Sequence, residues 1–423
     1  MSTKESILVA VVLLVLVCLS SPPMGAQLKE QSPNDRARQL FVEGKYRDLV
    51  DSLGRAPLDS LSPATLFTLG SAYSVLNEVQ PAVRYFRAAA QRDTANLSYR
   101  LQLARMLVES GMLRQAQTTY EAILERDPKH GAALAGLGRL LFDQRQFDKA
   151  SDVFGRSLRG NPRDFAVNYL LGASLFNRGL ADSAFAFLAV AQTLNPYYVP
   201  AIAMLALIQF NRDNFGEAAR LYRSALGQQS NQADLWYRAG LCYHRLQDLA
   251  EAKRCFSQAS RLDSANSTYL GHLGLVWYEL KQFDSARAAF ERAVRVDEEN
   301  PTLYLNLGLA LARMDSVGPA VEALKKAVVA YGPQDIARVY NEMGALYFSK
   351  ERYRDARAAY QKALTFDSRN RTAAFNLAFT LDQLGEYKRA AESYSRFVTI
   401  AAEDSTQRRN VAIAKERLRV LPR

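Results

Sequence analysis

The chain has 423 residues, of which 48% are hydrophobic and 23% charged, and its formal net charge is +11. This composition is that of a folded protein and excludes a largely disordered one. The length also exceeds what a single ordinary hydrophobic core accommodates. The positive charge suits anionic partners, such as acidic proteins, acidic polymers or a membrane surface. Because the basic residues are spread over the whole chain, the charge does not single out nucleic acid.

The N-terminal segment has the pattern of an export signal. Lys4 precedes an apolar run over residues 7–19, which is short for a membrane-spanning helix and suited to the core of a secretory signal. Two prolines follow, and small residues up to Ala26 suit cleavage, so we expect residues 1–26 to be a signal peptide. An uncleaved N-terminal anchor is the main alternative, and Cys18 leaves a lipoprotein as another. The expected location is the periplasm or cell envelope, where a nucleic-acid partner is not expected.

A 34-residue period runs through the rest of the chain, and a column of alanines marks it. Eight of them fall 34 residues apart, and the column resumes after one step of 36: Ala82, Ala116, Ala150, Ala184, Ala218, Ala252, Ala286, Ala320, Ala356 and Ala390. If each alanine is given position 20, full units begin at Pro63, Leu97, Gly131, Phe165, Val199, Ala233, Ser267, Pro301, Ala337 and Arg371. A period of this length predicts stacked pairs of helices.

Within each unit, apolar stripes at helical spacing predict two packed helices. Positions 4, 8 and 11 lie on one face of the first helix, and positions 20, 24 and 27 on one face of the second. Position 8 is always small: Gly70, Ala104, Gly138, Gly172, Ala206, Gly240, Gly274, Gly308, Gly344 and Ala378. Position 24 is always large: Phe86, Tyr120, Phe154, Leu188, Tyr222, Phe256, Phe290, Leu324, Tyr360 and Tyr394. Small residues at positions 8 and 20 let the two backbones approach, and the large side chains fill the groove between them.

Asp or Asn often stands where the second helix is expected to end, as in Asp127, Asn161, Asn195, Asp263, Asp297 and Asp367. These residue types tolerate the left-handed conformation that commonly ends a helix. We therefore predict that conformation at these positions. Two extra residues between 328 and 335 predict a lengthened loop, with a kink dividing two sub-arrays as the alternative.

These columns resemble the tetratricopeptide repeat family, and the resemblance covers ten full repeats over residues 63–404. It implies an all-α protein, a right-handed solenoid of antiparallel helix pairs. Residues 27–62 resemble a degenerate N-terminal helical repeat. Residues 405–423 are predicted to form a basic C-terminal capping helix, which a solenoid needs to cover its last exposed face.

The resemblance implies that the first helices line a concave groove and that positions 5, 9, 12 and 13 are among those that contact a ligand. Position 12 is aromatic or His in five successive repeats. The predicted partner-binding residues are Phe142, Tyr169, Phe176, Phe210, Tyr237, Leu241, His244, Leu275 and Tyr278, with Arg105, Arg139, Arg245 and Arg313 at the rim. The alternative is that the aromatic column packs between neighbouring repeats, and the sequence leaves both interpretations open.

No sequence motif indicates catalysis. The chain lacks a phosphate-binding Gly-rich loop and a Gly-x-Ser-x-Gly nucleophile motif. His130, His244 and His272 are too scattered for a metal site. Cys242 and Cys255 occupy positions that are apolar in other repeats and are expected to be small buried side chains, although export would permit a disulfide. We expect no catalytic residue, no metal and no cofactor.

The predicted function is a non-catalytic scaffold of the cell envelope that binds an extended peptide or a partner helix in its concave groove. One alternative is a protein that binds polysaccharide and assists its export, since sugars stack on aromatic rings. Trp236 and Trp277 weigh against it, because they occupy positions 4 and 11, which are predicted to be core. A regulatory subunit of an envelope enzyme complex is the other alternative.

Overall fold

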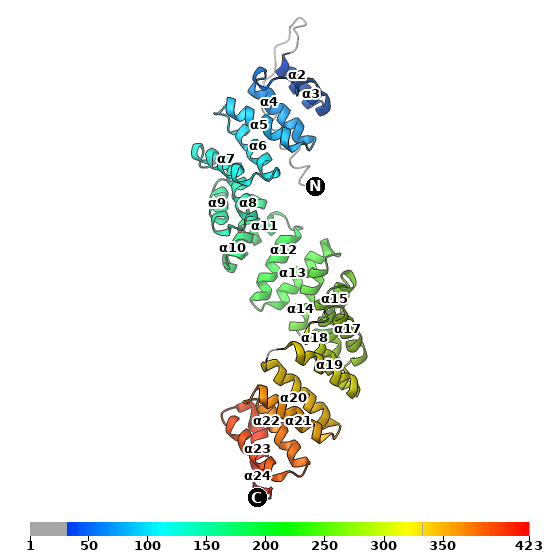
Figure 1. The fold of residues 1–423 in the computed structure, drawn as a ribbon. Coiled ribbons are helices and arrows are strands. Elements are labelled where there is room, and N and C mark those ends of the chain that lie inside the picture. Colours follow the sequence, from blue (N-terminus) through cyan, green and yellow to red (C-terminus); the bar gives the residue numbers. More distant parts are fainter. Residues whose placement is uncertain (1–31, 332, 423) are drawn as a thin grey trace. The chain divides into compact units, whose positions relative to one another are not determined.

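The computed structural model describes residues 32–331 and 333–422. The predicted signal peptide, residues 1–26, and the lipoprotein alternative at Cys18 lie outside the described residues. Within the described part, the regular elements are helices, which follow one another along the chain as labelled in Figure 1. The chain divides into two compact units, one ending at Leu205 and the other beginning at Ala206, and each is described by itself.

The first unit consists of short N-terminal helices followed by helix pairs that each match one predicted repeat. Its elements are α2 (Pro33–Val42), α3 (Tyr46–Leu53), the 3-10 turn η1 (Leu58–Ser60), α4 (Pro63–Val75), α5 (Val79–Arg92), α6 (Leu97–Glu109), α7 (Leu113–Arg126), α8 (Gly131–Asp143), α9 (Phe147–Gly160), α10 (Phe165–Asn177) and α11 (Ala181–Leu194). The boundary between the units falls within α12 (Val199–Asn211). In the first unit the two helices of each pair pack together, and α5, α7 and α9 also pack on the first helix of the next pair.

The second unit continues the same alternation and ends with an additional helix. Its elements are α13 (Phe215–Gln228), α14 (Ala233–Arg245), α15 (Leu249–Leu262), α16 (Ser267–Glu279), α17 (Phe283–Val296), α18 (Pro301–Arg313), α19 (Val317–Ala330), α20 (Pro333–Ser349), α21 (Tyr353–Phe366), α22 (Arg371–Gln383), α23 (Tyr387–Ile400), the 3-10 turn η2 (Ser405–Gln407) and α24 (Arg408–Val420). The predicted all-helical array of packed pairs is confirmed.

The predicted contact between positions 8 and 24 is confirmed in the seven pairs whose position 8 is glycine. A methyl group added at Gly138 would lie 2.6 Å from the ring of Phe154, and one added at Gly274 would lie 2.6 Å from the ring of Phe290. All ten alanines of the position-20 column are fully buried. In these pairs the large side chain of the second helix occupies the space that a Cβ would need on the first helix, and this close contact stabilises the pair.

The turn inside each repeat, between the first and second helix, has a left-handed residue at position 15. It is glycine at Gly111, Gly179 and Gly385, but seven non-glycine residues with φ of 58–64° stand there in the other repeats: Asn77, Arg145, Asp213, Gln247, Lys281, Asp315 and Glu351. The next N–H donates back to the carbonyl five residues earlier, as from Met112 to Leu107 over 2.8 Å. This is the Schellman arrangement that ends a helix.

The prediction that Asp or Asn closes the second helix in a left-handed conformation is wrong. At Asp127, Asn161, Asn195, Asp263, Asp297 and Asp367 the φ angle lies between −141° and −130°. Instead, several of these side chains accept a hydrogen bond from the N–H two residues on, as Asp127 does from Lys129 over 3.1 Å. The residue type suits an Asx turn rather than a positive φ.

The prediction of a longer loop near residues 328–335 is also wrong. Helix α19 ends at Ala330 and α20 begins at Pro333, so the added residues extend a first helix to 17 residues, where α18 and α22 have 13.

At the C-terminus, α24 packs on α23 and buries Ala414. Arg417 on α24 also donates to both carboxylate oxygens of Asp382 on α22, over 2.7 and 2.8 Å. Asp382 is buried while Arg417 is partly exposed, and this charge-assisted pair joins α24 to the last repeat.

Among the described residues, none of the helices has the length and apolar character needed to traverse a bilayer.

Candidate functional site

The predicted partner-binding residues of the second unit lie mainly on α14, α16 and α18, the first helices of three consecutive repeats. Tyr237, Leu241, His244 and Arg245 are on α14, Leu275 and Tyr278 on α16, and Arg313 on α18. Phe210 lies near the end of α12. The structure therefore brings most of the predicted set together on neighbouring first helices.

Hydrogen bonds between residues 35 apart connect these first helices. Nε2 of His244 lies 2.9 Å from Oε1 of Glu279, and Nε of Arg313 donates to the Tyr278 hydroxyl over 3.0 Å. In repeat numbering, position 12 of one first helix meets position 13 of the next. A second contact joins positions 5 and 6, where the Tyr237 hydroxyl lies 3.1 Å from Nε2 of His272.

The aromatic side chains at position 12 also pack within their own repeat. The rings of Phe142 and Phe147 have centroids 5.5 Å apart in an edge-to-face arrangement. Phe210 with Phe215 and Tyr278 with Phe283 repeat the contact at 5.2 and 5.5 Å. These position-12 rings are half-buried. One edge thus packs on the start of the second helix, and the remaining part is accessible to a partner.

The predicted residues of the first unit are less connected. Tyr169 packs edge-to-face on Tyr198 with centroids 5.0 Å apart, and burial raises the pKa of its hydroxyl. Arg139 is exposed and pairs within α8 with Asp143, at 3.0 Å. Arg105 and Phe176 are half-buried on α6 and α10. Here the structure shows side-chain packing and a local ion pair.

Leu241 and Leu275 are half-buried at position 9 of successive first helices, and Leu275 packs against a core cluster formed by residues of α17 to α21. Arg245 is exposed and forms no hydrogen bond or ion pair with the described residues. In the second unit, two half-buried leucines therefore lie beside the hydrogen-bonded polar residues of the first helices. Arg245 lies at the edge, without an ion-pair partner among the described residues.

The predicted partner-binding set did not include three polar residues near this face, Glu279, His272 and Glu342. Burial lowers the pKa of the His272 imidazole, and the positive charge of a protonated His244 would lower it further. Burial raises the pKa of the Glu342 carboxyl, while Arg313 and Arg338 act in the opposite direction. Glu279 and His272 each stand 35 residues after their partners His244 and Tyr237, which is one residue more than the repeat length. Both could have been identified only if this offset had been known.

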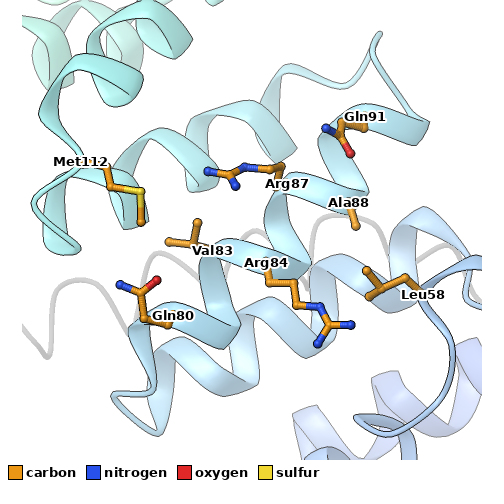
Figure 2. A pocket seen from close by; sticks show the side chains of 8 residues that line it. All are labelled: Leu58, Gln80, Val83, Arg84, Arg87, Ala88, Gln91 and Met112. Carbon is orange, nitrogen blue, oxygen red and sulfur yellow. The ribbon is translucent and has the colours of Figure 1, made fainter.

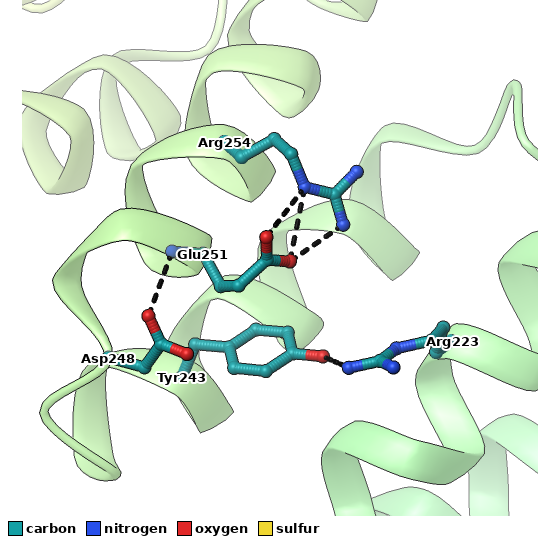
Figure 3. Close-up of polar contacts among 5 residues, drawn as sticks. All are labelled: Arg223, Tyr243, Asp248, Glu251 and Arg254. Carbon is teal, nitrogen blue, oxygen red and sulfur yellow. Dashed lines mark hydrogen bonds and ion pairs between the residues drawn. The ribbon is translucent and has the colours of Figure 1, made fainter.

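A network of cations and aromatic rings lies around α13, α14 and α15 in the second unit. Figure 3 shows Arg223 donating to the Tyr243 hydroxyl and Arg254 paired with Glu251. Arg254 also lies 5.3 Å from the ring centroid of Trp236, and Nζ of Lys253 lies 4.7 Å from that of Trp277.

Trp236 and Trp277 are half-buried, and Trp277 packs against a core cluster, so the prediction that both are core residues holds only in part. Their neighbouring cations cover part of each ring.

The thiols of Cys242 and Cys255 are buried and free. Burial raises the pKa of Cys242 to about 12 and that of Cys255 to about 11. Both side chains are therefore protonated at neutral pH and fill space as small apolar groups. Within the described residues, His, Cys, Asp and Glu form no group suited to hold a metal ion.

Open depressions lie on the described surface. One lies along α5 in the first unit (Figure 2), and another lies beside the start of α17, where Lys281, Phe283 and Arg313 are among the residues that line it. Only Arg313 belongs to the predicted partner-binding set.

Comparison with known proteins places most of the chain in repeat families. Tetratricopeptide repeat models match residues 77–140, 107–175, 337–370 and 372–404. A model described as the C-terminal domain of cilia and flagella-associated protein 70 matches residues 164–340. The search of curated proteins gave no significant match.

Solved structures also resemble the chain. The C-terminal part of a TPR repeat-containing protein from Cytophaga hutchinsonii is 16% identical, with a TM-score of 0.51 over 57% of this chain and 99% of that one. YrrB, described as a TPR protein with an unusual peptide-binding site, is 22% identical, with a TM-score of 0.41 over 44% of this chain and 95% of its own. Yeast Tom70 is 18% identical, with a TM-score of 0.39 over 91% and 95% of the two chains.

The architecture fits a scaffold for protein–protein interaction, since stacked helix pairs offer an extended surface rather than an enclosed site. The repeat columns, the packed helix pairs and the family matches agree: the chain belongs to the tetratricopeptide repeat family.

Proposed function

We propose that the protein is a non-catalytic scaffold of the cell envelope, and that it binds an extended peptide or a helix of a partner protein on the first helices α14, α16 and α18. The export signal predicted over residues 1–26 supports the location. N-terminal sequencing of the protein purified from an envelope fraction tests it, since a chain that starts at Met1 in the cytosol would contradict export.

One observation supports this binding site: half-buried apolar side chains lie beside hydrogen-bonded polar side chains on the same face. Leu241 and Leu275 supply apolar surface, and Tyr278 supplies an aromatic ring. The pairs His244–Glu279 and Tyr278–Arg313 hold polar groups in fixed positions along that face. Anchors of this kind, surrounded by ordered polar groups, are typical of surfaces that dock peptides.

Affinity capture from the native envelope tests the proposal with a matched pair of variants. Leu241→Ala/Leu275→Ala removes apolar anchors from the first helices of the sixth and seventh repeats. Leu262→Ala/Val296→Ala removes exposed apolar side chains from the second helices of the same repeats, where they are 40% and 44% exposed. We expect the first variant to lose the captured protein and the second to retain it, both with unchanged helical circular dichroism.

The same experiment distinguishes the alternative functions. Polysaccharide binding would survive loss of the leucines and depend on aromatic rings. A regulatory role would appear as co-purification with an enzyme in fixed stoichiometry. Retention of all partners by Leu241→Ala/Leu275→Ala would contradict a binding site on this face.

A further inference from the structure

The second-helix side of the first repeat carries a basic depression. It is lined by Leu58, Gln80, Val83, Arg84, Arg87, Ala88, Gln91 and Met112. Six of these belong to α5 and follow one another at the helical spacing that puts them on one face. Leu58 of η1 and Met112, which precedes α7, bound the depression on either side (Figure 2).

The depression is basic because its walls contain two arginines and its described lining contains no carboxylate. Arg84 is exposed and makes no hydrogen bond or ion pair with the described residues. Arg87 donates from Nη2 to Oε1 of Gln115 on α7 over 2.8 Å, which leaves its positive charge uncompensated. The nearby carboxylates already have partners, since Asp59 pairs with Arg92 at 2.7 Å and Glu78 lies 3.8 Å from Arg47.

The floor of the depression is apolar. Val83 is buried, and Leu58 and Met112 are half-buried beside it. Methionine adapts its shape to different apolar side chains. Figure 2 shows the side chains of Arg84 and Arg87 pointing away from each other, with Gln80 and Gln91 at the ends of the stripe. An apolar floor between two separated positive charges fits an apolar side chain flanked by acidic residues.

We propose that this depression is a second docking surface, which binds an acidic segment of a partner protein through Arg84 and Arg87 and seats one of its apolar side chains over Leu58, Val83 and Met112. It lies on a second helix of the first unit and shares no residue with the proposed binding face on α14, α16 and α18. Charge complementarity selects the partner: an acidic peptide gains contacts with both guanidinium groups, whereas a basic peptide is repelled.

A fluorescence anisotropy titration of the full-length protein tests the proposal. The probe is a fluorescein-labelled peptide, Gly-Glu-Asp-Leu-Phe-Glu-Asp-Gly, compared with its counterpart in which Gln and Asn replace Glu and Asp. We expect Arg84→Gln/Arg87→Gln to weaken binding about tenfold, which corresponds to the loss of two charge pairs. Replacing the peptide's Leu and Phe with Ser should weaken it further.

A matched control is available on α17. Arg292 and Arg295 are exposed, have the same spacing as Arg84 and Arg87, and form no ion pair with described residues. Arg292→Gln/Arg295→Gln removes the same net charge and should leave peptide binding unchanged, as should Leu241→Ala/Leu275→Ala on the first-helix face. The proposal would be overturned if the wild type did not bind the acidic peptide, if the amide counterpart bound equally well, or if either control weakened binding as much as the α5 variant.

Discussion

Nε2 of His244 lies 2.9 Å from Oε1 and 3.0 Å from Oε2 of Glu279, and this contact joins the first helices α14 and α16 of consecutive repeats. The two residues are 35 apart in the chain, one more than the repeat length. The side chains are 25% and 38% exposed, so solvent partly screens the interaction. The contact fixes the polar edge of the proposed binding face.

A double-mutant cycle measures this contact. We expect His244→Ala and Glu279→Ala to show a coupling of about 0.2–1 kcal/mol in the free energy of unfolding, the range of partly exposed pairs. A cycle of His244→Ala with Glu298→Ala, a carboxylate in the loop after α17, should show coupling near zero. Equal coupling in both cycles would mean that the effect is one of net charge rather than contact.

His272 predicts how stability depends on pH. Burial lowers the pKa of its imidazole below the ordinary value of 6.5, so the folded protein favours the neutral form more than the unfolded chain does. The contribution of His272 to the free energy of unfolding is therefore complete above about pH 6.5 and is lost as the pH falls through the folded-state pKa. Urea unfolding of wild type and His272→Gln between about pH 7.5 and about pH 5 checks this. An equal loss of stability in both proteins on acidification would contradict it.

The contact between positions 8 and 24 predicts opposite effects for two glycine substitutions. Gly274→Ala places a methyl group 2.6 Å from the Phe290 ring and should destabilise the protein by about 1–3 kcal/mol. Gly155→Ala, in α9 with no other atom within 4 Å of the added methyl, should stabilise it by about 0.5–1 kcal/mol. Thermal unfolding of both variants provides the measurement. Destabilisation of similar size in both would argue against close approach at position 8 as the cause.

The left-handed residues at position 15 predict a second pair of opposite effects. Lys281 has a φ of 60°, and its replacement by glycine should raise the free energy of unfolding by up to about 1 kcal/mol. Gly179 has a φ of 78° and nothing within 4 Å of an added Cβ, so Gly179→Ala should lower stability by about 1 kcal/mol through backbone strain alone. A stabilised Gly179→Ala protein would show that the turn relaxes to another conformation.

The repeat register and the helix pairing could be predicted from sequence because each depends on a local pattern that recurs. The alanine column and the pairing of Gly138 with Phe154 follow from spacing and side-chain size. The conformation at Asp127 could not be predicted in the same way, because Asp favours both an Asx turn and a left-handed helix end. Pro333 begins a helix where a loop was expected, since proline suits the first turn of a helix as well as a loop.

The candidate site was harder to predict than the fold. The sequence placed Tyr278 and His244 on one stripe, but their partners Arg313 and Glu279 depend on the offset between neighbouring first helices. That offset is set by how the repeats stack and does not appear in the period itself. Phe142 and Phe210 are half-buried because each packs on an aromatic ring at the start of the second helix of its own repeat. Two roles were expected for these residues, ligand contact and packing between neighbouring repeats, and this contact supports neither one alone.

The most direct test of the central claim is the affinity of a purified captured partner for three proteins: wild type, Leu241→Ala/Leu275→Ala and Leu262→Ala/Val296→Ala. Isothermal titration calorimetry should show binding weakened about tenfold or more by the first-helix variant, and within about twofold of wild type for the second-helix variant. Unchanged affinity for the first-helix variant, or an equal loss in both variants, would contradict a partner-binding face on α14, α16 and α18.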